Sequence, residues 1–232
     1  MTDQPPVSTD PSGEFARRIL LLFAHPALEK SRVNRRLLRE LRTIPGITFH
    51  DLYEAYPDFV IRVDHEQELL SSHDIIVLQH PFFWYSTPAI LKEWQDLVLE
   101  HGWAYGTDAT ALRGKWLTQV VTAGGREQSY RPGGLNRQTV REFLRPIEQT
   151  ASLCQMSYLP PFIVHGTHSL KKEGFEPYAA GYRRLLEALR DDQLDLEAAR
   201  TLTWLNEPGG PLECEDHRED ERNQEKEGQN DA

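Results

Sequence analysis

Short runs of consecutive apolar residues alternate along the chain with longer segments in which apolar residues recur every three or four positions. The first run, Ile19 to Ala24, is too short to span a membrane and is typical of a strand buried on both faces of a parallel sheet. His25-Pro26 ends this strand, because proline cannot donate to a sheet ladder. A helix is predicted from Ser31 to Leu41, with Ser31 capping it through the amide of Asn34.

The same plan of strand followed by helix recurs and predicts an α/β fold. Strands are expected at 47–53, 74–81, 116–122 and 158–165, and helices at 63–72, 89–100, 139–152 and 178–189. Pro146 should bend or shorten the helix at 139–152, and Pro160 and Pro161 should interrupt the last strand, as an edge strand allows. These units predict a three-layer, doubly wound, flavodoxin-like fold whose five-stranded parallel sheet has the order 2-1-3-4-5.

Composition divides the chain into four parts. Residues 1–16 are rich in Pro, Ser, Thr and Asp and are expected to form a disordered leader, while 17–192 form the flavodoxin-like domain. Residues 193–210 could add one amphipathic helix. Residues 211–232 contain nine acidic and three basic residues with few apolar ones, so an acidic disordered tail is expected there.

Charge and cysteine content limit the partners and the compartment. The formal net charge of −10 and a sequence pI near 5.4 argue against nucleic acid or an anionic membrane as the main partner. Cys154 and Cys214 lie far apart and lack metal-ligand spacing, so neither a disulfide framework nor a zinc site is indicated. A reducing cytoplasm is the simplest location for such a chain.

The loop after the first strand is a candidate anion-binding site. Free backbone N–H groups and the positive end of the helix dipole converge at Ser31, and a phosphate is their natural ligand. No G-x-G-x-x-G or G-x-x-x-x-G-K motif follows the strand, which disfavours the dinucleotide-binding fold and the P-loop ATPases. An ordinary strand-to-helix turn with a serine cap is the alternative interpretation of this stretch alone.

Two further loops are expected beside the first, because right-handed crossovers bring the ends of the first, third and fourth strands together. Phe82, Phe83, Trp84 and Tyr85 follow the third strand and suggest a ligand wall. Gly124-Gly125 follows the fourth and lets backbone amides approach a flat or anionic group, although a plain loop is the alternative. Flavin mononucleotide (FMN) would fit such a site, with its phosphate at the first loop, its ring against the aromatic residues and the glycines beneath it.

Several separate motifs resemble those of a known family, the NAD(P)H:quinone oxidoreductases. These motifs are Phe23 to Pro26 with Ser31 and Asn34, Gln79 to Lys92, His101 to Gly106, and Val121 to Gly125. The likeness is strongest to the ancillary flavoprotein subunits of glutathione-gated bacterial potassium-efflux systems, which also carry the string at Leu52 to Phe59. The resemblance covers about residues 18 to 190.

The resemblance implies a set of ligand-binding residues in three groups. The FMN phosphate and ribityl chain would be held by His25, Ser31, Arg32, Val33 and Asn34. The isoalloxazine ring would be lined by Phe82, Phe83, Trp84 and Tyr85, and its pyrimidine edge would meet backbone amides of Thr122, Ala123, Gly124 and Gly125. Trp103 and Tyr105 would bind substrate by facing the flavin of the second subunit in a homodimer.

The chain departs from the family pattern beside the glycine turn. Ala123 stands where the family commonly has threonine, and Arg131 to Gly134 replaces a loop rich in glycine and histidine. This leaves the proton donor to the acceptor open, with Tyr130 as the candidate catalytic residue and a purely structural tyrosine as the alternative. His165 and His168 lack a third ligand spaced nearby, so no metal is expected.

The leading hypothesis is a cytoplasmic FMN enzyme, with FAD an open alternative, that takes a hydride from NAD(P)H and reduces a quinone by two-electron ping-pong transfer. The main alternative is an ancillary regulatory subunit of a potassium-efflux transporter, located peripherally at the inner membrane through that partner. A flavodoxin-like module that has lost its flavin is a third alternative.

Overall fold

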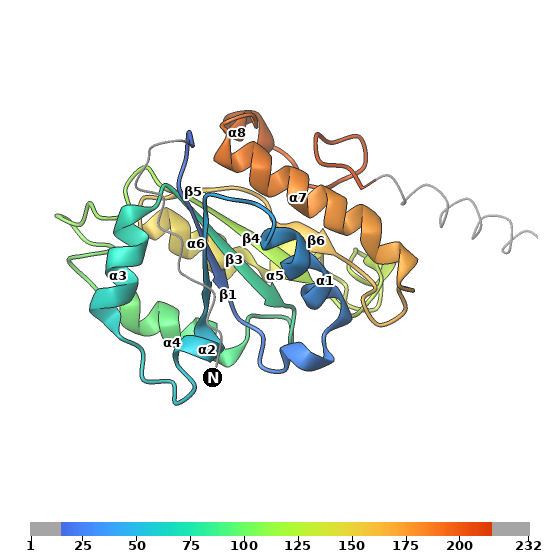
Figure 1. Ribbon diagram of the computed structural model, residues 1–232, viewed down its shortest axis with the longest axis horizontal. Coiled ribbons are helices and arrows are strands. Elements are labelled where there is room, and N and C mark those ends of the chain that lie inside the picture. The colour runs from blue at the N-terminus through green and yellow to red at the C-terminus, as the bar shows by residue number, and fades with distance from the viewer. Residues whose placement is uncertain (1–14, 215–232) are drawn as a thin grey trace, which may run out of the picture.

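The computed structural model describes residues 15–214 of the 232-residue chain. The parallel sheet has the strand order β2-β1-β3-β4-β5, and β6 also pairs with β4, which confirms the predicted order (Figure 1). The strands are β1 (Ile19–Phe23), β2 (Ile47–Asp51), β3 (Ile75–Pro81), β4 (Trp116–Thr122), β5 (Ser157–Tyr158) and β6 (Phe162–Val164). The predicted leader, apart from residues 15 and 16, and residues 215–232 of the predicted tail lie outside the described part.

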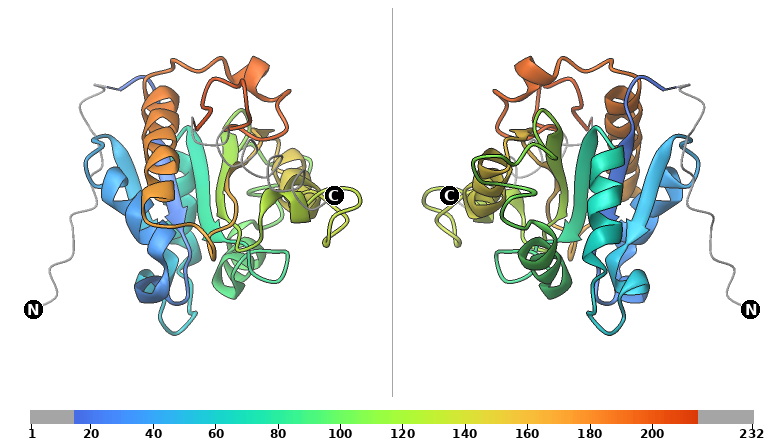
Figure 2. Two further views of the ribbon diagram at one scale, coloured as in Figure 1. Left: turned by 90° about the vertical axis from the view of Figure 1, so that its right-hand side faces the viewer. Right: turned by 90° about the vertical axis from the view of Figure 1, so that its left-hand side faces the viewer.

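The sheet is covered by helices on both faces (Figures 1 and 2). Every residue of β1 is buried, and its side chains alternate between the two layers: Leu21 packs with α1 and α7, while Leu20 packs with α3 and α4. The helices are α1 (Arg32–Leu41), α2 (Leu52–Ala55), α3 (Val63–Ser72), α4 (Ala89–Val98), α5 (Val140–Phe143), α6 (Arg145–Leu153), α7 (Glu176–Arg190) and α8 (Leu196–Ala199).

The predicted last strand is two short strands, so the sheet formed by residues 15–214 has six strands rather than five. The interruption covers Leu159 to Pro161, where two prolines lack the N–H groups that a ladder needs. Thr118 of β4 instead donates its hydroxyl to the carbonyl oxygen of Pro160 at 2.9 Å. Pairing with β4 resumes at Phe162, opposite Val120, so both short strands follow the same edge.

Helix boundaries differ from the sequence-based prediction at several places, one of which is the short α2, whose first two residues were expected to end the strand at 47–53. The predicted helix at 139–152 is divided into α5 and α6 at Leu144, just before Arg145-Pro146, in agreement with the expected effect of Pro146. The region at 193–210 contains only the short α8. Leu212 and Cys214 fall within the predicted acidic tail but are buried beside α7, so the packed part of the chain continues to Cys214.

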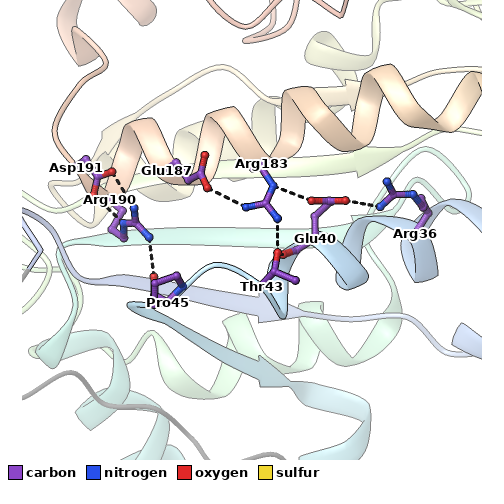
Figure 3. Close-up of polar contacts among 8 residues, drawn as sticks. All are labelled: Arg36, Glu40, Thr43, Pro45, Arg183, Glu187, Arg190 and Asp191. Carbon is purple, nitrogen blue, oxygen red and sulfur yellow. Dashed lines mark hydrogen bonds and ion pairs between the residues drawn. The ribbon is translucent and has the colours of Figure 1, made fainter.

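Ion pairs join α1 to α7 along the outer side of one layer (Figure 3). Glu40 of α1 accepts from Arg36 at 2.7 Å and from Arg183 of α7 at 2.8 Å. Arg183 also pairs with Glu187, at 3.0 Å, and Arg36 with Glu176, at 2.5 Å. Within residues 15–214 no helix has both the length and the apolar character needed to cross a bilayer.

Candidate functional site

The turn between β1 and α1 is held by its own polar groups. Ser31 is the N-cap of α1, and its hydroxyl oxygen accepts from the backbone N–H of Asn34 at 3.2 Å, as the sequence predicts. His25 Nδ1 accepts from the backbone N–H of Ala27 at 3.1 Å, so the neutral ring carries its proton on Nε2. Burial lowers the pKa of His25, which favours this neutral form. The Val33 side chain packs in the core, so only its backbone faces this turn.

A buried chain of hydrogen bonds ties this turn to the ends of β3 and β4. Asn34 Nδ2 donates to the hydroxyl oxygen of Thr122 at 2.9 Å and to that of Ser31 at 3.2 Å. Gln79 Nε2 donates to Asn34 Oδ1 at 3.4 Å, and the Tyr182 hydroxyl donates to Gln79 Oε1 at 2.7 Å. Because unsatisfied buried amides are costly, this chain fixes the spacing of the turns.

The aromatic loop after β3 separates into one inward and three outward side chains. Phe82 is buried with Val121 and Ile163, so its ring packs inward rather than lining the edge of the sheet. Phe83, Trp84 and Tyr85 are 43%, 93% and 48% exposed. Trp84 and Tyr85 have φ angles of 50° and 65°, a left-handed conformation that costs about 1–2 kcal/mol per residue. Strained, exposed aromatic residues are typical of a binding site.

The first and second loops meet through their rings. The His25 ring lies edge-on to the Phe83 ring, with their centroids 5.9 Å apart. The backbone joins the same two segments at their base, where the Ala24 N–H donates to the Gln79 carbonyl oxygen at 3.0 Å. The predicted phosphate turn and the outward aromatic residues therefore lie side by side at the same edge of the sheet.

The glycine turn after β4 is packed by the loop that follows β6. A Cβ atom on Gly124 would overlap the imidazole of His168, and one on Gly125 would lie 3.0 Å from the Tyr130 ring. The backbones are joined by Thr167 N–H to Ala123 carbonyl at 3.1 Å. The absence of side chains at both glycines is thus what allows this close approach.

Tyr130 lies over the glycine turn in a partly buried position. Its ring centroid is 5.8 Å from that of Phe82 and 5.8 Å from that of His165. Burial, with a smaller effect from Tyr85, raises the pKa of the Tyr130 phenol. The group is therefore protonated at neutral pH and able to donate a hydrogen bond.

Trp103 and Tyr105 lie in the loop after α4, which turns back at Gly102. The backbone N–H of Gly102 donates to the carbonyl oxygen of Tyr105 at 2.8 Å, and the Tyr105 ring lies edge-on to His101 at 5.4 Å. Both aromatic residues are partly buried against the core of the α3/α4 layer. Their predicted role across a dimer interface stays a prediction.

Two features of the site were not foreseen from the sequence. Arg32 is exposed and donates to the carbonyl oxygens of Thr167 and His168, at 3.2 and 3.3 Å, which joins α1 to the loop after β6. The second is the Gln79–Tyr182 contact. The strand order places the loop after the last strand at the same edge as α1, so the predicted topology could have indicated the Arg32 contacts.

Among residues 15–214, no group of three or more His, Cys, Asp or Glu side chains is placed to hold a metal ion.

The fold and these motifs agree with comparisons to known proteins. A family model described as a flavodoxin-like fold matches residues 17–186. The chain belongs to this flavodoxin-like family. Among curated relatives of this flavodoxin-like chain, the "glutathione-regulated potassium-efflux system ancillary protein KefG" of Serratia proteamaculans is 47% identical over 165 residues, which cover 71% of this chain and 90% of the relative.

Solved structures of flavodoxin-like proteins point in the same direction. General stress protein 14 from Treponema denticola, solved in complex with FMN, is 37% identical with a TM-score of 0.71, covering 75% of this chain and 99% of that chain. The NADPH-quinone reductase from P. pentosaceus is 32% identical with a TM-score of 0.66, covering 72% of this chain and 96% of that chain.

Proposed function

We propose that this chain binds FMN and transfers electrons from NAD(P)H to a quinone or a similar acceptor. The observation that carries the proposal is the convergence of three turns, joined by the Asn34–Thr122 hydrogen bond and the His25–Phe83 ring contact. The FMN complex of the Treponema relative and the NADPH-quinone reductase from P. pentosaceus support the choice of cofactor and reaction.

The residues present fit FMN. The N-terminus of α1 at Ser31 offers backbone N–H groups, and the Nε2–H of His25 offers another donor, for a phosphate. Phe83, Trp84 and Tyr85 offer exposed rings for stacking against an aromatic system. Gly124 and Gly125 lie at the same edge, against His168 and Tyr130, and backbone N–H groups at such a turn can stabilise negative charge without titrating. Bound FMN would accept a hydride from NAD(P)H and pass two electrons to the acceptor.

Tyr130 would act on the acceptor as a hydrogen-bond donor. Its raised pKa keeps the proton on the phenol at neutral pH, and its ring lies directly against Gly125 of the glycine turn. Donation to a quinone oxygen would stabilise the charge that develops there on reduction. Nicotinamide and acceptor would use the same aromatic wall in turn, which predicts ping-pong kinetics.

A homodimer would complete the site. Trp84 exposes 93% of its surface beside the exposed Phe83 and Tyr85, and a contiguous exposed apolar patch of this kind marks an interaction or ligand site. Trp103 and Tyr105 of the second subunit would then form the opposite wall and position the nicotinamide or quinone ring.

A spectrum of the purified full chain tests cofactor binding most directly. We expect flavin absorbance, or its appearance after FMN is added, and oxidation of NADPH or NADH only when a quinone is present. Initial rates at several quinone concentrations should give the parallel double-reciprocal lines of a ping-pong reaction. A protein that stays colourless with excess FMN, or intersecting lines with normal flavin content, would contradict the corresponding part of the proposal.

A second function is favoured by the KefG relatives, which are named as ancillary proteins of a potassium-efflux system. In this role the cytoplasmic chain would bind a membrane transporter and regulate its flux, with reductase activity secondary. Potassium efflux measured with and without the chain would test it. If potassium efflux is the same with and without the bound, flavin-loaded protein, the regulatory role is contradicted and only the proposed reductase function remains.

A further inference from the structure

The exposed face of α1 carries a row of like charges. Arg32, Arg35, Arg39 and the C-cap residue Arg42 are all exposed, and their spacing of three, four and three places them on one side of the helix. We call these four residues the arginine stripe. Like charges at such spacing repel each other, so the stripe favours an anionic neighbour.

The stripe is not neutralised by the acidic residues next to it. Glu40 pairs instead with Arg36 and Arg183 (Figure 3). Glu176 pairs with Arg36. Arg32 donates to the backbone carbonyl oxygens of Thr167 and His168, and Arg35 donates to that of Glu29 at 3.4 Å. With respect to residues 15–214, none of the four stripe arginines forms an ion pair.

A groove runs between the stripe and the start of α7. Its volume is about 260 Å³, and Lys172 and Phe175 line it together with Arg32, Arg35, Arg36 and Arg39. The Arg32 guanidinium lies 5.4 Å from the centre of the Phe175 ring, which fixes that end of the groove. The groove therefore presents several cations to one elongated anionic ligand.

Residues 215–232 have the complementary charge. These eighteen residues contain eight acidic and three basic side chains, which amounts to half of the formal net charge of −10. An external polyanion would meet a protein that is negative overall, whereas a segment of the same chain is already tethered. Tethering within one chain gives effective concentrations on the order of 1 mM.

The point where the described chain ends lies within reach of the stripe. Cys214 is buried against Gly181 of α7, and Arg184 donates to the Glu213 carbonyl oxygen at 2.7 Å. Helix α7 in turn runs alongside α1 (Figure 1). The axial distance from Arg184 back to Glu176 is about 12 Å at 1.5 Å per residue. Eighteen residues can span up to about 60 Å.

We propose that residues 215–232 dock on the arginine stripe of their own chain through carboxylate–guanidinium pairs. The docked segment would screen the positive charge next to Ser31, at the N-terminal end of α1. The proposal does not depend on the identity of the cofactor or the substrate.

Zero-length carbodiimide cross-linking of the full chain tests this proposal, because Lys172 lines the groove and the segment supplies carboxylates. We expect cross-links between Lys172 and residues 215–232 at low ionic strength, and their loss in 1 M salt. Arg39→Glu should reduce their yield about threefold or more, as expected when one of several ion pairs becomes repulsive. Arg145→Glu, a matched charge reversal of an exposed arginine on α6, should leave the yield unchanged.

Mixing isotopically labelled and unlabelled chains shows whether the cross-link joins one chain or two. Cross-links within one chain support the proposal, and cross-links only between chains would overturn it in favour of a second copy. An absence of cross-links, or equal yields in wild type and Arg39→Glu, would also overturn it. Arg39-dependent binding of anionic vesicles or duplex DNA, with no cross-link in the chain, would assign the stripe to an external polyanion instead.

Discussion

The side-chain amide of Asn34 donates to the hydroxyl of Thr122 over 2.9 Å, although the two residues are 88 positions apart in the sequence. One residue belongs to the first turn of α1 and the other ends β4, immediately before the glycine turn. Both side chains are buried. This contact therefore sets the distance between the predicted phosphate turn and the predicted ring platform.

Replacing Thr122 with valine should weaken FMN binding. Valine has the same shape but cannot accept the Asn34 hydrogen bond, which leaves a buried donor unsatisfied at a cost of about 1–2 kcal/mol. If the lost hydrogen bond lets the two turns move apart, the same free energy is lost from FMN binding, and the dissociation constant for FMN rises about tenfold. Fluorescence quenching of added FMN measures this constant.

Thr48→Val is the matched control for this variant. Thr48 is also a buried threonine with a side-chain partner, His73, but it lies near the amino end of β2. We expect a similar loss in the free energy of unfolding and unchanged FMN affinity. Equal FMN affinities for the two variants would mean that the Asn34–Thr122 contact serves stability alone.

Replacing Gly124 with alanine should displace His168, because the added Cβ would overlap its ring. We expect at least a tenfold loss of FMN affinity if the ligand also needs the bare backbone at Gly124. The double variant Gly124→Ala/His168→Ala separates the two effects, since it removes the overlap and keeps the methyl group. Recovery of full affinity in the double variant would show that only His168 had been disturbed.

Much of this site was predictable from the sequence, because several of its features depend on interactions between residues that are close together in the chain. The serine cap at Ser31, the burial of β1 and the break at Pro146 follow from rules that act over a few positions. The Gln79–Tyr182 contact joins residues 103 positions apart and depends on how α7 packs. The inward turn of Phe82 was missed for the same reason, since a run of four aromatic residues does not reveal which ring faces the core.

Replacing Tyr130 with phenylalanine should slow acceptor reduction selectively. If the phenol donates to the quinone oxygen, kcat/KM for quinone falls about tenfold or more, while reduction by NAD(P)H keeps its rate. Stopped-flow measurement of the two half-reactions makes the distinction. Equal slowing of both halves, or of neither, would indicate that Tyr130 has a structural role beside Gly125.

Replacing Glu66 with glutamine should reduce the acid sensitivity of the fold. Burial raises the pKa of Glu66, but hydrogen bonds from His50, Tyr56 and Trp94 outweigh it, so the pKa is lowered overall. The stabilisation is thus present above the pKa of an unfolded glutamate and is lost as pH falls through the folded value. Denaturant titration at pH 7 should show that the free energy of unfolding of the variant is about 2–4 kcal/mol lower than that of the wild type. The loss should shrink towards pH 3, and a constant difference would contradict this account.

Replacing Asp51 with asparagine should have the opposite pH dependence. Burial raises the pKa of Asp51 to about 6 from 3.8, despite hydrogen bonds from the backbone N–H groups of Tyr53 and Glu54 at the start of α2. Its contribution to stability is complete below pH 3.8 and is lost as pH rises through about 6. Asparagine caps a helix equally well and carries no charge to desolvate, so the variant should be more stable than wild type at pH 7, by about 1–2 kcal/mol. The two proteins should converge near pH 4 in denaturant titrations, and a variant that is less stable at pH 7 would show that the Asp51 charge is needed at the cap.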